Sequence, residues 1–178
     1  MDTFAERIWV LDTSALIEIK QLLNPEYRRQ VFEELTKVCN DRRILYPIKV
    51  LKELQEVTKT GVEDLPLAWA KKNQDLGCRL GTCDEELETV RNHPIARFTP
   101  EMTKLKNERD ADPYILATAL KLKSLGEHPV VVTQESRKQI PQVPLNIAAG
   151  SLGFPSIHLY ALLLELGVWQ DQFISPHK

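Results

Sequence analysis

Short, continuous apolar runs recur along the chain and predict buried β-strands. They lie at residues 8–11, 43–46, 129–133 and 154–159. The run at 129–133 is the clearest, because β-branched residues dominate it, as is typical of a strand inside a parallel sheet. Each run is bounded by polar residues or proline, so we expect short strands separated by longer connections.

Between these runs, apolar residues recur at helical spacing and predict amphipathic helices. The helices are expected at residues 15–23, 27–39, 49–60, 110–125 and 160–166. Gly61 and Gly126 follow two of them as C-terminal caps would. Strands that alternate with helices predict an α/β fold with a mostly parallel central sheet. The polar stretch 62–99 has weaker periodicity, and we expect it to form a helical insertion.

Length and cysteine content favour one soluble domain over residues 1–178. A chain of this size buries roughly 70% of its unfolded surface, so it needs neither disulfides nor a structural metal to fold. Cys39, Cys78 and Cys83 form an odd, unpatterned set that suits a reducing cytoplasm, and we expect them to be buried. A zinc site would need a second Cys/His pair at metal-binding spacing. Neither a signal peptide nor a stretch of about 20 apolar residues is present, so we expect a cytoplasmic protein without membrane contact.

The charge balance excludes a strongly basic nucleic-acid-binding domain, because the formal net charge is −2. Any RNA-binding surface must therefore be local. The best candidates are Arg109, Arg137 and Lys138, which lie near acidic candidate residues in the sequence. Two other basic pairs, at 28–29 and 42–43, are expected to be solvated or to form local ion pairs.

Four acidic residues lie where a parallel sheet collects ligands, near the carboxyl ends of strands and the starts of helices. Asp12 directly follows the first predicted strand, and Glu135 lies two residues after the strand at 129–133. Asp112 lies at the entry to the helical stretch 113–125, and Glu53 lies near the start of the helix at 49–60. Carboxylate oxygens are the ligands that Mg²⁺ and Mn²⁺ prefer, so this edge is a candidate metal site.

Asp12 and Asp112 also have purely structural interpretations. Asp12 would serve equally well as a turn residue or the N-cap of the following helix. Asp112 precedes Pro113, which matches an N-cap followed by proline at the first helical position, and taken alone this favours a capping role. Asp110 competes with Asp112 for the place at the helix entry.

Glu53 and Glu135 have structural alternatives as well. Glu53 would be an ordinary surface residue of its helix, and Glu56 is its rival for a place in the site. Glu135 would be a residue of a surface loop. The order and spacing of the acids therefore carry more weight than any single carboxylate.

The ordered set of motifs resembles the PIN-domain family. An apolar strand followed by Asp12-Thr13-Ser14 resembles the opening of PIN domains. The segment 50–53 (Val-Leu-Lys-Glu) is similar to their second acidic motif, and 112–119 (Asp-Pro-Tyr-Ile-Leu-Ala-Thr-Ala) is similar to the third. The segment 131–135 (Val-Val-Thr-Gln-Glu) resembles the fourth, although PIN domains commonly carry aspartate where this chain has Glu135.

The resemblance implies a three-layer α/β/α sandwich and a Mg²⁺- or Mn²⁺-dependent endoribonuclease. Many PIN proteins are toxins of toxin–antitoxin pairs, so it also implies an RNA substrate, an antitoxin partner that obstructs the acidic site, and a homodimer. Asp12 and Asp112 would be the main metal ligands. Glu53 would bind the metal directly or through water, and Glu135 would orient water or a second ion.

Three hydroxyl residues accompany these acids. By the same resemblance, Thr13, Ser14 and Thr133 would hold the carboxylates or reach a phosphate. Thr133 would equally serve as an ordinary strand residue whose hydroxyl bonds to backbone. The three lie next to Asp12 or next to the strand end before Glu135.

Other functions remain open from the sequence. A phosphatase that uses an aspartate nucleophile would want a second aspartate two residues after the first, where this chain has Ser14. A PIN-like nuclease of RNA maturation or DNA processing would carry the same motifs as a toxin. A catalytically degenerate PIN-like module that binds RNA or protein is the non-enzymatic alternative.

Overall fold

The computed structural model describes residues 7–58, 64–96, 111–134 and 143–174, and its core is a four-stranded parallel sheet. The strands are β1 (Arg7–Leu11), β2 (Ile44–Leu45), β3 (His128–Val132) and β4 (Ser156–Ile157). Their order across the sheet is β2-β1-β3-β4. The predicted α/β fold with a mostly parallel sheet is therefore confirmed.

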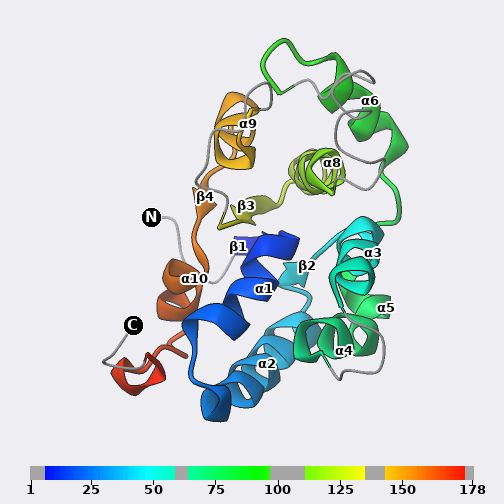
Figure 1. Ribbon diagram of the computed structural model, residues 1–178. Coiled ribbons are helices and arrows are strands. Elements are labelled where there is room, and N and C mark those ends of the chain that lie inside the picture. The colour runs from blue at the N-terminus through cyan, green and yellow to red at the C-terminus, as the bar shows by residue number, and fades with distance from the viewer. Residues whose placement is uncertain (1–6, 59–63, 97–110, 135–142, 175–178) are drawn as a thin grey trace.

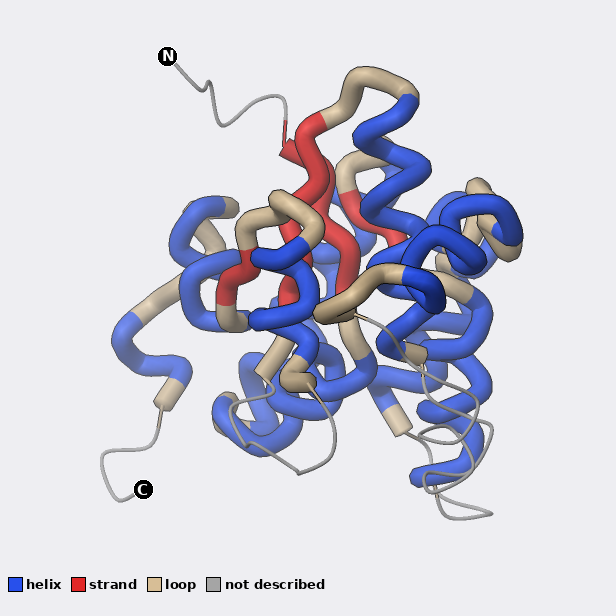
Figure 2. The backbone as a smooth tube through the Cα atoms, turned by 90° about the horizontal axis from the view of Figure 1, so that it is seen from above, coloured by secondary structure: helices blue, strands red, loops and turns tan. Residues whose placement is uncertain are grey.

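Helices surround this sheet on both sides (Figure 1). They are α1 (Thr13–Leu22), α2 (Pro25–Asn40), α3 (Ile48–Val57), α4 (Leu65–Lys72), α5 (Gln74–Gly77), α6 (Asp84–Asn92), α8 (Asp112–Ser124), α9 (Leu145–Ser151) and α10 (Leu159–Glu165), followed by the 3₁₀ helix η2 (Asp171–Phe173). One layer contains α1, α2, α3, α4 and α10, and the other contains α6, α8 and α9. Figure 2 shows the strands at the centre with helices flanking them. The predicted three-layer sandwich is confirmed.

The central strands β1 and β3 are paired in register over their full length. Arg7 lies opposite His128, and Leu11 lies opposite Val132. Both strands therefore end at the same level of the sheet. The backbone N–H of Asp12 continues the ladder by donating to the carbonyl of Val132 at 2.9 Å. The residues that follow these strands are consequently neighbours, although about 120 positions separate them in the chain.

The core is built from the apolar runs that the sequence predicts. Trp9 and the rest of the β1 run are almost fully buried, as are Val131 and Val132 of β3. Small residues of α8, Ala117 and Ala119, let this helix approach the sheet closely. The remaining members of the same cluster extend the core along the chain to Phe173.

The cysteines largely follow the expected burial. Cys39 and Cys83 are buried and Cys78 is half-buried, and all three are free thiols. The rings of Trp69 and Tyr46 pack against each other inside the core, with 5.5 Å between their centroids.

None of the helices in the described part of the chain combines the length and apolar character needed to cross a membrane.

The structure corrects several boundaries. The predicted strands at 43–46 and 154–159 shrink to two residues each, because β2 and β4 are the edge strands. Gly61, the expected cap of the third helix, lies outside the described residues. The described part of the stretch 62–99, residues 64–96, is largely helical as expected, but its helices join both layers. Helix α4 packs against α2 and α3, and α6 packs against α8.

Candidate functional site

Asp12 is the buried centre of the candidate site, with only 5% of its surface exposed. It occupies the N-cap position of α1, yet its side chain caps no helical N–H. Its Oδ2 atom instead accepts hydrogen bonds from the hydroxyls of Ser14 and Thr133, the latter at 2.9 Å. Hydroxyl donors stabilise an ionised carboxylate. The Asp12 carboxylate is therefore directed to the sheet edge. A capping role in α1 does not explain why an aspartate stands at this position.

Ser14 and Thr133 form one hydrogen-bonded group with this carboxylate. Their hydroxyl oxygens lie 3.3 Å apart, and Ser14 Oγ also accepts the backbone N–H of Gln134 at 3.0 Å. Thr133 is 1% exposed. Of the two roles expected for Thr133, the structure shows the one in which its hydroxyl holds a carboxylate. This hydrogen bond joins the end of β3 to the start of α1.

Two residues that sequence analysis did not single out hold the end of β3 from the other side. His158 Nδ1 lies 2.9 Å from the carbonyl oxygen of Thr133. The Gln134 side-chain carbonyl accepts the backbone N–H of Leu159 at 2.8 Å. Gln134 lies within a predicted motif, so its proximity was foreseeable. His158 is 25 residues away in the chain, and only the pairing of β3 with β4 brings it here.

Glu53 connects the starts of two helices. It is half-buried on α3, and its Oε2 atom accepts the hydroxyl of Thr13 at the start of α1. Its Oε1 atom accepts the backbone N–H of Ala111, at the start of α8, at 2.8 Å. Glu56, its rival, is exposed. Glu53 is therefore no ordinary surface residue of its helix.

Asp112 does not cap α8, and this corrects the capping interpretation. Ala111 occupies the N-cap position without a side-chain hydrogen bond, Asp112 is the first helical residue, and Pro113 is the second. Asp112 is half-buried and adjoins the residue whose N–H Glu53 accepts. Asp110, the other candidate for the helix entry, lies outside the described residues.

Lys49 adds a positive charge near this edge, which sequence analysis did not identify. Its ammonium lies 5.1 Å from the centre of the Tyr114 ring, a cation–π distance. Lys49 belongs to the first turn of α3, and Tyr114 belongs to the first turn of α8. The helices that carry Glu53 and Asp112, α3 and α8, are thus linked a second time.

Two hydrogen-bonded groups therefore meet at the carboxyl edge of the sheet. One joins Asp12 to Ser14 and Thr133, and the other joins Thr13 to Glu53 and the start of α8. Within the described ranges, no three His, Cys, Asp or Glu side chains are grouped so that they could hold a metal ion. Further predicted site residues lie outside those ranges: Glu135, Arg109, Arg137 and Lys138.

Comparison with known proteins identifies a family but no activity. A family model described as a domain of unknown function (DUF4411) matches residues 9–169, which include every described residue of the candidate site. No curated protein matches the chain. No solved structure matches it either.

Proposed function

Because this chain belongs to the family of domains of unknown function DUF4411, we propose its function from its site: a metal-dependent endoribonuclease. The proposal rests on the geometry at the carboxyl edge of the sheet and on the resemblance of its motifs to those of PIN domains. Hydrolysis of an RNA phosphodiester bond is the reaction that a cluster of carboxylates with a divalent ion would catalyse there.

The observation that carries the proposal is the way Asp12 is held. Burying a carboxylate costs free energy, and a structural aspartate at this position would normally recover part of it by capping α1. Asp12 instead bonds to Thr133 and Ser14 beside the ends of β1 and β3. In parallel α/β sheets, this is the edge at which ligands bind.

The donor chemistry fits a hard cation. Carboxylate and hydroxyl oxygens surround the edge, and Mg²⁺ or Mn²⁺ prefers such ligands while keeping several waters. Asp12 and Asp112 would hold the ion. Both oxygens of Glu53 already accept hydrogen bonds from the protein, which favours a water-mediated role for this residue. Glu135, the fourth predicted acid, would orient water or a second ion.

Each group would have a separate task in hydrolysis. The bound ion would activate a water and neutralise the charge that develops on the phosphate. Thr133 and Ser14 would keep the Asp12 carboxylate in one orientation. Glu53 would hold the start of α8, and with it Asp112, at the same edge of the sheet. Lys49 would attract the phosphate backbone of the substrate.

The biological setting is proposed from the resemblance. Such an endoribonuclease would be the toxin of a toxin–antitoxin pair, with an antitoxin and a second copy of the chain as partners. A PIN-like nuclease of RNA maturation or DNA processing would use the same residues. A neighbouring gene for a small DNA-binding protein would favour the toxin.

Cleavage assays test the reaction. Purified protein is incubated with RNA and Mn²⁺ or Mg²⁺, and the Asp12→Asn and Asp112→Asn variants are measured in parallel. Each variant should lose about 100-fold or more in rate, because even residues that only orient metal ligands cost 10–100-fold when mutated. Asp75→Asn, on exposed α5, is the matched control and should cleave normally. Equal cleavage by all four proteins would indicate a contaminating nuclease and contradict the proposal.

Metal binding is tested separately by thermal unfolding. A cation that binds only the folded state stabilises it by about 2.7 kcal/mol at 100 times its dissociation constant. We expect Mn²⁺ to raise the melting temperature of the wild type and of Asp75→Asn, but not of Asp12→Asn. An unchanged melting temperature of the wild type at millimolar Mn²⁺ would argue against a metal site.

A non-catalytic PIN-like module is the second candidate. It is favoured by one observation: within the described ranges, no group of three acids or other metal-binding side chains is formed. Binding of RNA without cleavage, together with the absence of a metal-induced melting shift, would select this function over the endoribonuclease.

A further inference from the structure

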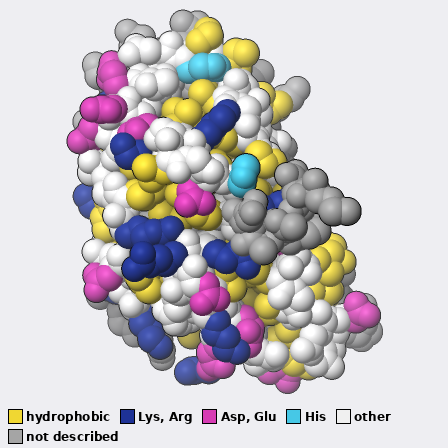
Figure 3. Space-filling view, turned by 180° about the vertical axis from the view of Figure 1, so that it is seen from behind, with side chains coloured by type: hydrophobic (Ala, Val, Ile, Leu, Met, Phe, Trp, Pro, Cys, Tyr) yellow, Lys and Arg dark blue, Asp and Glu magenta, His cyan; other side chains and the backbone are white. Residues whose placement is uncertain are grey.

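A second site lies at the opposite, amino edge of the sheet. A cleft of about 650 Å³ opens between the start of β1, the loop that follows α2, and the C-terminal end of α8. Its walls contain arginines from these segments and from the region after α5, together with leucines of α8. Seen from behind, Lys and Arg side chains gather beside hydrophobic surface at mid-height of the molecule (Figure 3).

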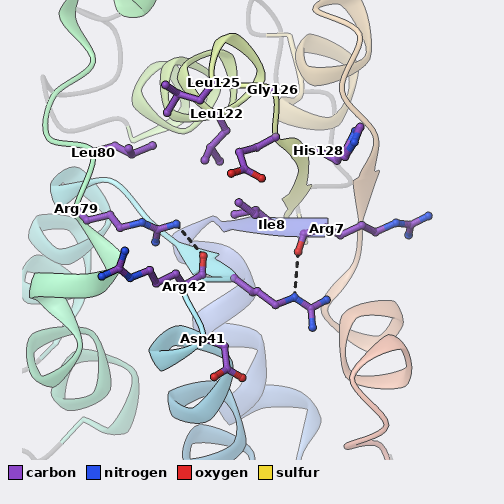
Figure 4. Close-up of a pocket in the computed structure, with 12 residues that line it drawn as sticks. Arg7, Ile8, Asp41, Arg42, Arg79, Leu80, Leu122, Leu125, Gly126 and His128 are labelled. Carbon is purple, nitrogen blue, oxygen red and sulfur yellow. Dashed lines mark hydrogen bonds between the residues drawn. The ribbon is translucent and has the colours of Figure 1, made fainter. Parts of the chain in front are cut away.

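The cleft has one apolar wall and one cationic wall (Figure 4). Leu122 and Leu125, at the end of α8, face Ile8 and Leu80 across the apolar part. Arg42 and Arg79 lie on the cationic side. Arg43 also lines the cleft. The Arg7 guanidinium points away from them and pairs with Glu165 of α10 at 3.0 Å, so it does not contribute to the cationic wall.

Two of these arginines are held in place before any ligand arrives. Arg79 donates to the carbonyl oxygens of Arg42 at 2.7 Å and of Leu76 at 3.2 Å. Arg43 lies 4.5 Å above the Trp9 ring and donates from Nε to the Arg7 carbonyl at 3.3 Å. A guanidinium has five N–H donors, so the two hydrogen bonds of Arg79 orient this group without using all of its donors. Such preorganisation lowers the entropic cost of binding.

Arg42 occupies a backbone position that ordinarily belongs to glycine. It follows the C-cap of α2 with φ of +60°, and Arg42 and Arg43 donate backbone N–H bonds to the carbonyls of Cys39 and Val38. This is a Schellman ending, in which glycine is usual because left-handed backbone is strained for other residues. The same ending of α8, on the other side of the cleft, has Gly126 at φ of +84°.

A structural explanation of the arginines accounts for only part of this arrangement. Cations near helix C-termini offset the partial negative charge there, and α2 and α8 both end at the cleft. That effect explains why Arg79 contacts a carbonyl after α2. It requires neither an arginine in the strained position 42 nor an apolar wall opposite. The expectation that the pair 42–43 is merely solvated is thus incomplete.

The charge in the cleft is unbalanced. Burial lowers the pKa of Arg79, and the neighbouring Arg42 lowers it further, whereas Cys39 and Glu127 raise it. Asp41 carries one of the two acidic side chains in the lining, and it points away from Arg42 and Arg79 (Figure 4). An anion between the guanidinium groups would relieve their mutual repulsion.

We propose that this cleft binds a nucleotide, with its phosphates on the guanidinium wall and its base against the apolar wall. The guanidinium fork matches phosphate oxygens, and the leucines offer a surface for a flat ring. Glu127, which also lines the cleft, would accept a hydrogen bond from an amino group of the base. The volume suits a small ligand of this size. The site is separate from the acidic edge, so this inference does not rest on the proposed nuclease activity.

Calorimetric titration of the full chain in EDTA tests the site. The probes are ADP, inorganic pyrophosphate, adenosine and a ten-nucleotide single-stranded RNA. We expect ADP to bind about tenfold or more tightly than pyrophosphate or adenosine alone, because each contacts only one wall. The Asp12→Asn variant should bind ADP like the wild type, so failure of the nuclease proposal would leave this result intact.

Two variants separate the walls. Arg42→Gly should lower the affinity for ADP about tenfold or more. The melting temperature should stay the same or rise, because glycine relieves the strain of the left-handed backbone at this position. Leu125→Ser changes a side chain that is 59% exposed, and it should lower the affinity for ADP but not the affinity for pyrophosphate. Arg29→Ala, on exposed surface of the same helix α2, is the charge control and should leave binding unchanged.

Several outcomes would overturn the proposal. Equal affinity for pyrophosphate and ADP would reduce the cleft to a phosphate site. Binding of the RNA without binding of ADP would assign the surface to an RNA chain. Unchanged ADP binding by Arg42→Gly, or a lower melting temperature as its only effect, would leave the arginine with a purely structural role. The absence of ADP binding to the wild type would reject the site.

Discussion

At the scale of single residues, the candidate site depends on two hydroxyl groups that act on one carboxylate. Asp12 accepts hydrogen bonds from Ser14, two residues later, and from Thr133, on another strand. The first contact is local and could be anticipated from the Asp-Thr-Ser sequence. The second gives Thr133 a role in orienting Asp12.

Replacing Thr133 by valine should isolate this role. Valine keeps the branched shape of the strand residue but cannot donate to Asp12, so we expect RNA cleavage to fall about 10–100-fold. The free energy of unfolding should fall by about 1–3 kcal/mol, because the buried carboxylate loses a donor. Cleavage rates and urea unfolding measure the two effects.

Thr118→Val is the matched control for this change. Thr118 is also buried, but its hydroxyl donates to the Tyr114 carbonyl within α8 at 2.8 Å. It should keep the cleavage rate of the wild type. A Thr133→Val protein with unchanged cleavage would show that the hydroxyl only stabilises the fold.

At the scale of elements, the packing of helix ends places the acids. Glu53 bonds to the start of α1 and to the start of α8, so α3 acts as a spacer between them. A comparable packing constraint lies where α5 ends against β2. A Cβ atom on Gly77 would lie 2.2 Å from the Tyr46 ring, which is buried and donates its hydroxyl to the Ala70 carbonyl.

Gly77→Ala should therefore destabilise the protein. The Tyr46 ring has no room to move, and overpacking of a core costs about 1–3 kcal/mol. Gly150→Ala in helix α9 is the control, because among the described residues no atom beyond its chain neighbours and its own helix backbone lies within 4 Å of the added Cβ. That change should stabilise the protein by about 0.5–1 kcal/mol. Urea unfolding of both variants measures the difference, and an unaffected Gly77→Ala would contradict the tight contact.

At the scale of the whole molecule, the sheet presents opposite chemistry at its two edges. The carboxyl edge collects Asp12 and its neighbours, and the amino edge collects arginines opposite an apolar wall. A net charge of −2 conceals this separation. It is a consequence of parallel strands, because all strand ends of one kind lie on the same side.

The buried thiols predict how stability responds to alkaline pH. Burial raises the pKa of Cys78 to about 12 and raises the pKa of Cys39 and Cys83 above the ordinary 9.0. The unfolded chain therefore releases these protons first, so stability is complete below pH 9 and declines as the pH rises toward 12. Urea unfolding between pH 7 and 11 should show this decline. Cys78→Ala should make it shallower, and an identical slope would contradict the assignment.

Much of the fold and part of the site could be predicted from the sequence. Apolar periodicity identified the strands and helices, because burial of one face requires it. The position of Asp12 directly after a strand followed from the same pattern. The interpretation of Asp112 as the N-cap of its helix was wrong, because α8 begins at Asp112, one residue earlier than the aspartate–proline pair suggests. Glu135 and the basic candidates beyond the described ranges stay predictions.

The sequence by itself determined the alternation of strands and helices, the parallel sheet, and the acidic residues that follow its strands. These depend on local order along the chain. Only the tertiary structure decided that Thr133 faces Asp12, that Glu53 joins α1 to α8, and that Arg42 shares a cleft with Leu122. The physical reason is that such contacts depend on strand register and helix packing between distant segments, which periodicity does not specify.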